Sequence, residues 1–416
     1  MDRNGLNRRT LVALGAGTLA TGGAAAAPEI DTGRVENGRV VFPPWVAPTE
    51  RPAPEPAAPM PVADRVGFAV MGLGRLSLEQ ILPALGMTKK ARLAALISGT
   101  PAKAAQVAAQ YGVPSSAVYD YDGLERIRDN PDIKVVYVVV PNGLHKDYTL
   151  RTAQAGKHVL CEKPMAVSSV EAQAMVEGCR AARCLLMIAY RCQYEPYNRE
   201  VLRLVRSAAY GPARFIDATN VQNQGDGTQW RFNRALAGGG ALPDVGLYCL
   251  NAARYLTGEE PVEVFSRIVN PVGDARYAEV EETMTFTLRF PGGVVANCAT
   301  SYGMHESRLL RVHTPGAAIV LDDAFSYGGQ HLRISHRDGP AETIDDRRLP
   351  RQNQFALEID HMAECVLSGR QPHTPGEEGV QDHRIMEALY RSAASGQPVE
   401  LPRSDGLDRF RGPQPT

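Results

Sequence analysis

Three side chains of this sequence could carry proton-transfer chemistry. Lys163 stands between a glutamate and a proline in Cys161-Glu162-Lys163-Pro164, at the expected end of a buried strand over residues 158–161. Asp244 and Tyr248 are four residues apart, so on a helix they share one face. A free tyrosine has a pKa near 10, so Tyr248 needs a nearby cation to accept a proton at neutral pH. We expect Lys163 to be that cation. Without further motifs, the alternative is that Tyr248 is an aromatic packed in a helical core.

A glycine-rich turn follows the first strongly apolar run of the chain. Residues 65–71 form an expected buried strand, Gly72-Leu73-Gly74-Arg75-Leu76-Ser77 comes next, and an apolar helical stretch reaches residue 85. Gly72 permits a tight turn, Gly74 lets backbone N–H groups approach a pyrophosphate, and the helix N-terminus favours its negative charge. Ser77 stands where the third small residue of the fingerprint packs helix on strand. The order of strand, turn and helix favours dinucleotide binding over a simple tight turn.

The end of the next expected strand, over residues 92–97, indicates which dinucleotide is bound. An NAD-binding fold usually places an acidic residue there to accept hydrogen bonds from the ribose 2′-hydroxyl. This chain instead has Ser98-Gly99-Thr100-Pro101-Ala102-Lys103, which offers a hydroxyl and a lysine but no carboxylate. Such groups can bind a 2′-phosphate, so the pattern predicts NADP. The alternative for Lys103 is a solvated helix lysine.

Strands and helices alternate from residue 65 to residue 190, which is typical of a doubly wound parallel sheet. The apolar strand 134–140 ends at Pro141-Asn142-Gly143-Leu144-His145, and the strand 158–161 ends at the Lys163 motif. Helices are expected at 101–111, around 124–128, up to 155 and at 169–182, with a linking segment at 118–121 and a strand at 184–189. Ligands bind at the carboxyl edge of such a sheet, so we predict an α/β Rossmann domain over 65–190.

From about residue 215 the pattern becomes alternating. Met284, Phe286, Leu288 and Phe290 face one way and their neighbours face the other. Strands are also expected at 214–221, 262–269, 294–301, 309–313 and 318–321. We predict an α+β domain over 191–416, built on a large, open-faced, mainly antiparallel sheet. Helices around 247–256, 355–367 and 380–394 can cover one face only, and the final helices pack back on the first domain. The uncovered face is a candidate subunit interface.

Length and composition exclude several classes of partner. With 416 residues and 44% apolar content, the chain is long enough for two cores. Lysine and arginine number 45 against 46 acidic residues, so no charge imbalance draws the protein to nucleic acid or to a membrane surface. Seven cysteines without CxxC or Cys/His spacing argue against zinc and against a disulfide framework. We therefore expect a small-molecule partner and no metal.

The first 27 residues have the features of an export signal. Arg8 and Arg9 precede a weakly apolar run over 11–20, and residues 24–27 supply an A-x-A cleavage site. The run is too short to span a membrane as a helix. The pattern predicts a twin-arginine signal over 1–27 and a periplasmic protein without a membrane anchor; an ordinary Sec signal or a fortuitous arginine pair are the alternatives. The twin-arginine route carries proteins that fold before they cross, often around a cofactor, so a bound cofactor is implied.

Residues 28–64 are rich in proline, including Pro43-Pro44, and are predicted to form an extended arm. A disordered linker is the alternative. The apolar residues Val41, Phe42, Trp45 and Val46 suggest that part of the arm docks on a folded surface, such as that of a neighbouring subunit.

Several motifs occur together in one order: GLG, PNGLH, AGKHVLCEKP, MIAYRCQYEP, and Gly238-Gly239-Gly240-Ala241-Leu242-Pro243-Asp244-Val245-Gly246-Leu247-Tyr248. In this combination the chain resembles the Gfo/Idh/MocA oxidoreductases, and within them the periplasmic glucose-fructose and aldose-aldose oxidoreductases. Ala189 and Leu76 depart from that pattern, where relatives have glycine and an aromatic residue. The resemblance implies a set of cofactor-contacting residues: Gly72, Leu73, Gly74, Arg75, Leu76, Ser98, Gly99, Lys103, Tyr121, Pro141, Asn142, His145, Glu162, Lys163, Arg191, Trp230, Arg231 and Tyr327.

The same resemblance implies an activity. Tyr248 would remove the proton of a sugar hydroxyl while hydride leaves for a tightly bound NADP, and Asp244 would orient Tyr248 or hold a substrate hydroxyl. An aldose such as glucose would become a lactone, and a second sugar, fructose or an aldose, would be reduced by the same cofactor. A homodimer or homotetramer would form through the open sheet face and the arm. The alternatives are a conventional NAD(P)-dependent sugar or cyclitol dehydrogenase, or a catalytically silent sugar-binding protein.

Overall fold

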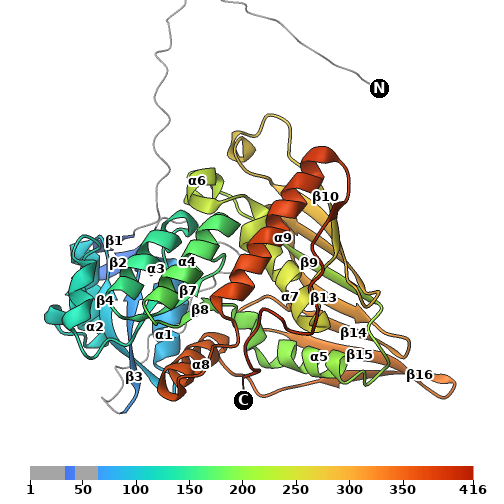
Figure 1. The fold of residues 1–416 in the computed structure, drawn as a ribbon, viewed down its shortest axis with the longest axis horizontal. Helices are drawn as coiled ribbons and strands as arrows, with labels where there is room; N and C mark the ends of the chain where they lie inside the picture. Colours follow the sequence, from blue (N-terminus) through green and yellow to red (C-terminus); the bar gives the residue numbers. More distant parts are fainter. Residues whose placement is uncertain (1–32, 43–63, 416) are drawn as a thin grey trace, which may run out of the picture.

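Two large sheets form the body of the protein. The computed structural model describes residues 33–42 and 64–415, so the predicted signal over 1–27 lies outside the described residues. In Figure 1 the two sheets stand side by side, and helix α9 (Gly376–Ser395) runs between them, where it packs against α4 (Ser169–Ala181) and β10 (Glu263–Val269). Within the described residues, no helix is both long enough and apolar enough to cross a membrane.

The first sheet is the predicted doubly wound parallel sheet. Its six strands pair in the order β5-β4-β3-β6-β7-β8, and every pairing is parallel. Strands β3 and β6 are buried along their whole length, as the apolar runs require. The strands are β3 (Val66–Met71), β4 (Ala91–Ile97), β5 (Val118–Tyr119), β6 (Val135–Val138), β7 (His158–Glu162) and β8 (Leu186–Ala189).

The connections between these strands are helical. They are η1 (Ser77–Ile81), α1 (Leu82–Leu85), α2 (Pro101–Tyr111), η2 (Ser115–Ala117), η3 (Leu124–Asp129), η4 (Asn142–Leu144), α3 (His145–Gln154), α4 and η5 (Arg191–Gln193). Two expectations need correction. The predicted helix around 124–128 is the 3₁₀ segment η3, and the predicted linking segment 118–121 contains strand β5. β5 pairs with β4 through two residues only, too few for a recognisable period.

The second sheet has nine strands in the order β16-β15-β14-β13-β9-β12-β11-β10-β17. All its pairings are antiparallel except that between β9 and β12, which confirms the mainly antiparallel prediction. Besides β10, the strands are β9 (Phe215–Asn223), β11 (Thr283–Arg289), β12 (Val295–Ser301), β13 (Gly303–His313), β14 (Ala317–Asp322), β15 (His331–Asp338), β16 (Ala341–Arg347) and β17 (Val399–Glu400). Strands β15 and β16 were not predicted, because β16 at the edge of the sheet and β15 beside it carry many charged and exposed residues in place of an apolar run.

Helices cover one face of this sheet, as predicted. On β11, Met284, Phe286 and Leu288 are buried under the helices, whereas Thr285 and Arg289 are exposed on the opposite face. The covering helices are α5 (Pro196–Arg206), α7 (Leu247–Thr257) and α9. Helix α8 (Gln354–Ser368), one of the helices expected beside this sheet, packs on β3, β4 and α1 of the first sheet, in agreement with the expectation that the final helices pack back on the first domain. The remaining short elements are η6 (Trp230–Phe232), α6 (Arg234–Ala237), η7 (Leu242–Gly246) and η8 (Ala275–Tyr277).

Part of the N-terminal arm is a hairpin rather than an extended segment. Strands β1 (Arg34–Glu36) and β2 (Arg39–Val41) pair through a turn in which Asn37 and Gly38 have φ of 50° and 76°. An Asn-Gly pair between two strands favours such a turn, and the extended-arm prediction overlooked it. The hairpin docks on α2 of the same chain, and Trp45 and Val46 lie outside the described residues.

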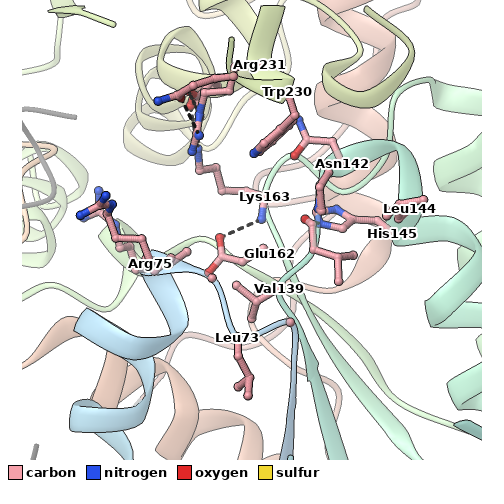
Figure 2. Close-up of a pocket in the computed structure, with 18 of the residues that line it drawn as sticks. Leu73, Arg75, Val139, Asn142, Leu144, His145, Glu162, Lys163, Trp230 and Arg231 are labelled. Carbon is pink, nitrogen blue, oxygen red and sulfur yellow. Dashed lines mark hydrogen bonds and ion pairs between the residues drawn. The ribbon is translucent and has the colours of Figure 1, made fainter. Parts of the chain in front are cut away.

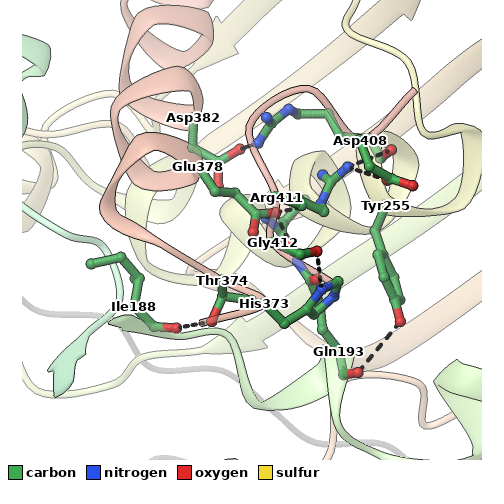
Figure 3. Close-up of polar contacts among 12 residues, drawn as sticks. Ile188, Gln193, Tyr255, His373, Thr374, Glu378, Asp382, Asp408, Arg411 and Gly412 are labelled. Carbon is green, nitrogen blue, oxygen red and sulfur yellow. Dashed lines mark hydrogen bonds and ion pairs between the residues drawn. The ribbon is translucent and has the colours of Figure 1, made fainter. Parts of the chain in front are cut away.

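A buried ionic network ties the C-terminal segment to the centre of the molecule. The fully buried Arg411 donates to Glu378 of α9 at 2.8 Å and to Asp408 at 3.2 Å, as Figure 3 shows. The Glu378 carboxylate also accepts hydrogen bonds from Gln193 and Asn251. Because charges out of water need partners, this cluster holds the last residues of the chain against α7 and α9.

We predict that Arg411→Met lowers the free energy of unfolding by about 3–5 kcal/mol, since it leaves the Glu378 carboxylate buried without its cation. Denaturant unfolding would measure the loss. The double variant with Glu378→Gln should recover part of it, and the exposed Arg409→Met should change stability by less than about 0.5 kcal/mol. Equal losses for Arg411→Met and Arg409→Met would contradict the prediction.

Candidate active site

A cavity of about 330 Å³ lies where the carboxyl edge of the parallel sheet meets η7 and α7 of the second domain. Figure 2 shows Glu162 and Lys163 lying between the glycine turn, with Leu73 and Arg75, and the segment of Trp230 and Arg231. Every site residue predicted from the sequence lines this cavity. They are Gly72, Leu73, Gly74, Arg75, Leu76, Ser98, Gly99, Lys103, Tyr121, Pro141, Asn142, His145, Glu162, Lys163, Arg191, Trp230, Arg231, Asp244, Tyr248 and Tyr327.

The glycine turn forms one end of the cavity. Gly72 has φ of +90°, and a Cβ atom there would lie 2.0 Å from the carbonyl oxygen of Val139, so no other residue fits. The Ser77 hydroxyl donates to the Gly72 carbonyl oxygen at 2.5 Å and fastens the following helix to the turn. Gly72 thus lets the turn lie directly against the end of β6, and the turn lines the cavity where a pyrophosphate would bind.

Among the residues that the structure describes, the wall at the end of β4 carries positive charge and no carboxylate. Lys103 is only 3% exposed, and its ammonium lies 5.9 Å from the ring centre of Phe42, so it is not the solvated helix lysine that the sequence left open. Arg75 lies 5.2 Å from the same ring. Tyr121 packs on Gly99, where a Cβ atom would come within 3.0 Å of its ring. This corner suits a phosphate group beside a flat ring.

Lys163 and Asp244 join the two domains across the cavity. The Lys163 ammonium donates to the Asp244 carboxylate at 3.2 Å and to its backbone carbonyl at 2.7 Å. Arg231 and Tyr302 donate to the other carboxylate oxygen at 3.0 and 2.8 Å. Burial by itself would raise the pKa of Asp244, but the charges of Lys163 and Arg231 outweigh it and hold that pKa well below its ordinary value. Asp244 is therefore a fixed anion at neutral pH.

The hydroxyl of Tyr248 has a different cation from the one we expected. Lys163 lies over the Tyr248 ring, 4.7 Å from its centre, whereas Arg191 donates to the hydroxyl at 3.0 Å. Arg191 is held in turn by the side chain of Gln354 and the carbonyl oxygen of Phe325, at 2.5 and 2.6 Å. Burial raises the pKa of Tyr248 above its ordinary value, and the Arg191 charge opposes that rise. The predicted tuning by Lys163 is corrected, because its ammonium is directed at Asp244.

Other predicted residues shape the walls. The Asn142 amide donates to the Ala237 carbonyl oxygen at 2.9 Å, and His145 is fixed between the carbonyl oxygens of Val140 and Pro164. The Arg231 guanidinium stacks on the Trp230 ring at 4.7 Å, and that of Arg191 on the Tyr327 ring at 4.6 Å. These contacts orient the lining but leave the cavity open.

Two family models match the chain. One describes an oxidoreductase family with an NAD-binding Rossmann fold and matches residues 66–190, and the other describes the GFO/IDH/MocA C-terminal domain and matches residues 198–320. The chain belongs to the Gfo/Idh/MocA oxidoreductase family. This confirms the predicted resemblance and the predicted fold class.

Individual members of the Gfo/Idh/MocA family are also similar. The chain is 31% identical over 342 residues to the D-xylose 1-dehydrogenase [NADP(+)] of Haloarcula marismortui, which covers 81% of this chain and 93% of that protein. Among solved structures, the aldose-aldose oxidoreductase from Caulobacter crescentus, complexed with glycerol, is 44% identical with a TM-score of 0.78, over 81% of this chain and 100% of that one. A levoglucosan dehydrogenase at 22% identity and a TM-score of 0.73, over 82% of this chain and 100% of that one, shows the shared fold.

In this member of the Gfo/Idh/MocA family, sequence reasoning missed the part of the wall supplied by the large sheet. The inward-facing residues of β9 change from Ile216 and Ala218 to Asn220 and Gln222, and Arg308 of β13 lies opposite Asn220. That change from apolar to polar within one alternating strand was the available signal. The cavity-lining residues that were not predicted are Thr100, Val139, Val140, Leu144, Asn220, Gln222, Gln229, Val245, Arg308, Phe325 and Phe355.

We predict that Asp244→Asn lowers the free energy of unfolding at pH 7 by about 3 kcal/mol, because Lys163 and Arg231 lose their counter-charge. Because the pKa of Asp244 is lowered in the folded state, its carboxylate stabilises the fold fully above the unfolded-state pKa near 4. This stabilisation is lost as the pH falls through the folded-state pKa. Denaturant unfolding of the protein and the variant should therefore converge in strong acid. A difference that stays constant with pH would contradict this account.

Proposed function

We propose that the protein is a periplasmic sugar oxidoreductase that keeps one NADP bound throughout its cycle. It oxidises an aldose such as glucose at C1 to the lactone and then reduces a second sugar, fructose or another aldose. The observation that carries the proposal is the single cavity that joins a dinucleotide cradle to the cluster of Lys163, Asp244 and Tyr248.

The residues present fit NADP. Gly72 and Gly74 place the turn at the cavity wall, where Gly74 would let the backbone approach the pyrophosphate, and Ser98 and Lys103 provide a hydroxyl and a buried cation for the 2′-phosphate. Within the described part of the chain, the carboxylates that line the cavity are Glu162 and Asp244, and neither belongs to β4, whose end would hold the acidic residue of an NAD site. When bound, NADP would supply the site that takes up hydride from the first sugar and returns it to the second.

The protein's own side chains then handle the proton and the orientation of the sugar. Tyr248 takes the proton from the sugar hydroxyl as the C–H bond breaks, and returns it to the carbonyl oxygen of the second sugar. Arg191 donates to the Tyr248 oxygen and stabilises the phenolate, which accepts the proton in the oxidation and is restored when the proton is returned in the reduction. Lys163 and Asp244, locked together, give the sugar hydroxyls one donor and one acceptor at fixed positions.

Tight retention of the cofactor is supported by the N-terminal hairpin. Phe42, at its end, covers Arg75 and Lys103, so it closes the corner proposed for the 2′-phosphate. A protein exported with its cofactor needs such retention, because the periplasm has no nicotinamide pool from which a lost cofactor could be replaced. Because the cofactor has to stay bound, the first sugar would reduce it and the second sugar would oxidise it again in the same site.

A conventional NADP-dependent sugar dehydrogenase, which exchanges its cofactor, is the second candidate. It is favoured by the likeness to D-xylose 1-dehydrogenase, whereas the 44% identity to an aldose-aldose oxidoreductase favours the bound-cofactor cycle. A silent sugar-binding protein is disfavoured because Lys163, Asp244 and Tyr248 are all present and in contact.

We also propose that two or four copies associate through the open face of the nine-stranded sheet. A shallow depression of about 290 Å³ lies on that face, and Ile344 beside it is 64% exposed. The depression is lined by Arg311, His313, Ala318, Val320, Arg333, Ser335 and Ile344. A second copy would bury these apolar and cationic groups.

The bound-cofactor cycle predicts a specific spectroscopic result. The purified, dialysed protein should release NADP on denaturation, identified by mass spectrometry. Glucose added to the native protein should raise the absorbance of reduced nicotinamide without added cofactor, and fructose or a second aldose should reverse the change. Absence of bound nicotinamide, or a reduction that no sugar reverses, would leave the conventional dehydrogenase as the function.

Tyr248→Phe should retain the nucleotide and abolish both half-reactions, because the proton acceptor is removed while the fold is kept. The raised pKa of Tyr248 sets the sign of the pH dependence: sugar oxidation needs the phenolate, so its rate should rise by about tenfold per pH unit below that pKa. Stopped-flow absorbance at several pH values would test this. A pH-independent oxidation rate would remove Tyr248 from the role of base.

Export through the twin-arginine route predicts that Arg8→Lys/Arg9→Lys leaves the protein unprocessed in the cytoplasm, since paired arginines are what this route reads. Cell fractionation and the mass of the mature N-terminus would measure it. Export that survives the double replacement, or the absence of any processed form, would contradict the periplasmic proposal.

A further inference from the structure

Behind the cavity wall, one tyrosine hydroxyl lies between two buried carboxyl groups. Tyr137 of β6 is completely buried, and its hydroxyl oxygen is 2.7 Å from Glu162 and 3.1 Å from Glu358. Glu162 comes from the end of β7 and lines the cavity. Glu358 comes from α8, is 0% exposed and does not line the cavity.

The number of hydrogen atoms available for hydrogen bonds fixes the protonation of Tyr137, Glu162 and Glu358 as a group. The Tyr137 hydroxyl has one hydrogen and can donate it to one carboxyl group only. If both glutamates were ionised, one carboxylate would face the tyrosine oxygen without a donor, and no water could replace that donor at the fully buried Glu358. An unpaired buried charge is far more costly than a neutral carboxylic acid. One glutamate therefore carries a proton and donates it to the tyrosine oxygen.

The contacts of the two glutamates show which one carries the proton. The second oxygen of Glu162 accepts the backbone N–H of Lys163 at 3.2 Å. Burial raises the pKa of Glu162 as well, but its hydrogen bond with Tyr137 and the charges of Lys163 and Arg191 oppose that rise. The second oxygen of Glu358 has no hydrogen-bond partner among the residues that the structure describes. Protonated Glu358 thus donates to the Tyr137 oxygen, and the Tyr137 hydroxyl donates to the Glu162 carboxylate.

The surroundings of Glu358 agree with a neutral acid. The ionisable groups that face it are Glu162 of β7, Tyr137 of β6, and Arg191, Cys192 and Tyr194 of the segment at η5. Burial, followed by the negative charge of Glu162, raises the pKa of Glu358 well above its ordinary value, against a smaller opposing effect of Arg191. Arg191 is already occupied by Gln354, Phe325 and Tyr248.

We propose that Glu358 is a positioning residue that keeps its proton at neutral pH and, through Tyr137, holds the Glu162 carboxylate against the Lys163 backbone at the cavity wall. The same helix supports the other side of the site. Gln354 lies one turn before Glu358, on the same face of α8, and accepts the hydrogen bond that fixes Arg191 beside Tyr248. Gln354 and Glu358 of α8 therefore support Tyr248 and Lys163 from behind the cavity wall and do not line the cavity themselves.

A matched pair of isosteric variants locates the proton. In Glu358→Gln the amide N–H can replace the acid as donor to Tyr137, and no ionisable group remains. Because folding above the unfolded-state pKa near 4.3 requires Glu358 to take up a proton, the variant should gain stability relative to the parent as the pH rises. We expect a Tm about 2 °C or more above the parent at pH 8, with the difference vanishing near pH 4. Glu162→Gln should lower Tm at pH 8.

Infrared difference spectroscopy gives a readout that needs no substrate. The parent at pH 7 should show the carbonyl stretch of a protonated carboxylic acid, which Glu358→Gln removes and the exposed Glu342→Gln retains. If the band is absent from the parent, or Glu358→Gln lowers Tm at pH 8, or Glu162→Gln is the tolerated variant, the proposal is overturned.

The kinetic readout alone rests on the proposed function. Glu358→Gln should keep kcat for sugar oxidation within about twofold, whereas Glu358→Leu, which removes the donor to Tyr137, should lower kcat about tenfold with KM unchanged. An equal loss of kcat in both variants would contradict the positioning role. If no sugar is oxidised by the parent, the proposed function fails while the thermal and infrared results still decide the place of the proton.

Discussion

The ion pair between Lys163 and Asp244 is the constraint on which the site depends. Lys163 stands at the end of a parallel strand in the first domain, and Asp244 stands on η7 in the second, so the contact exists only when the domains are docked. Arg231 and Tyr302 complete the shell of donors around the carboxylate. A buried carboxylate with three such partners is held ionised and immobile, and it in turn fixes the lysine beside the ring of Tyr248.

Helix α8 carries the second level of support. Although it follows the large sheet in the chain, it packs on the first domain and directs Gln354 and Glu358 at the back of the cavity. Each residue acts through an intermediary, Arg191 in one case and Tyr137 in the other. Because Gln354 and Glu358 lie behind the cavity wall, they position the site residues without occupying the space that a ligand would fill.

Much of the site could be predicted because parallel sheets collect strand ends at one edge. The turn at Gly72, the end of β4 at Ser98 and the motif at Lys163 all follow apolar strands, and each lines the cavity. The family resemblance supplied the residues of the second domain, such as Arg231. The prediction missed Asn220, Gln222 and Arg308 because alternation of apolar residues was the main signal used to predict their strands, and these three residues are polar. It missed the hairpin of β1 and β2 because the prolines that follow favoured an extended segment.

The sequence by itself determined the local structure: the two kinds of sheet, the glycine turn that tolerates no Cβ atom, and the absence of an acidic residue after β4. These follow from apolar period, backbone sterics and residue charge within short segments. Only the tertiary structure decided which partner each ionisable group meets. In the folded protein Lys163 pairs with Asp244, and Arg191 donates a hydrogen bond to the Tyr248 hydroxyl. Glu358 contacts Tyr137, which is 221 residues away in the sequence. Burial and charge pairing set those protonation states, and both arise from the packing of elements distant in the chain.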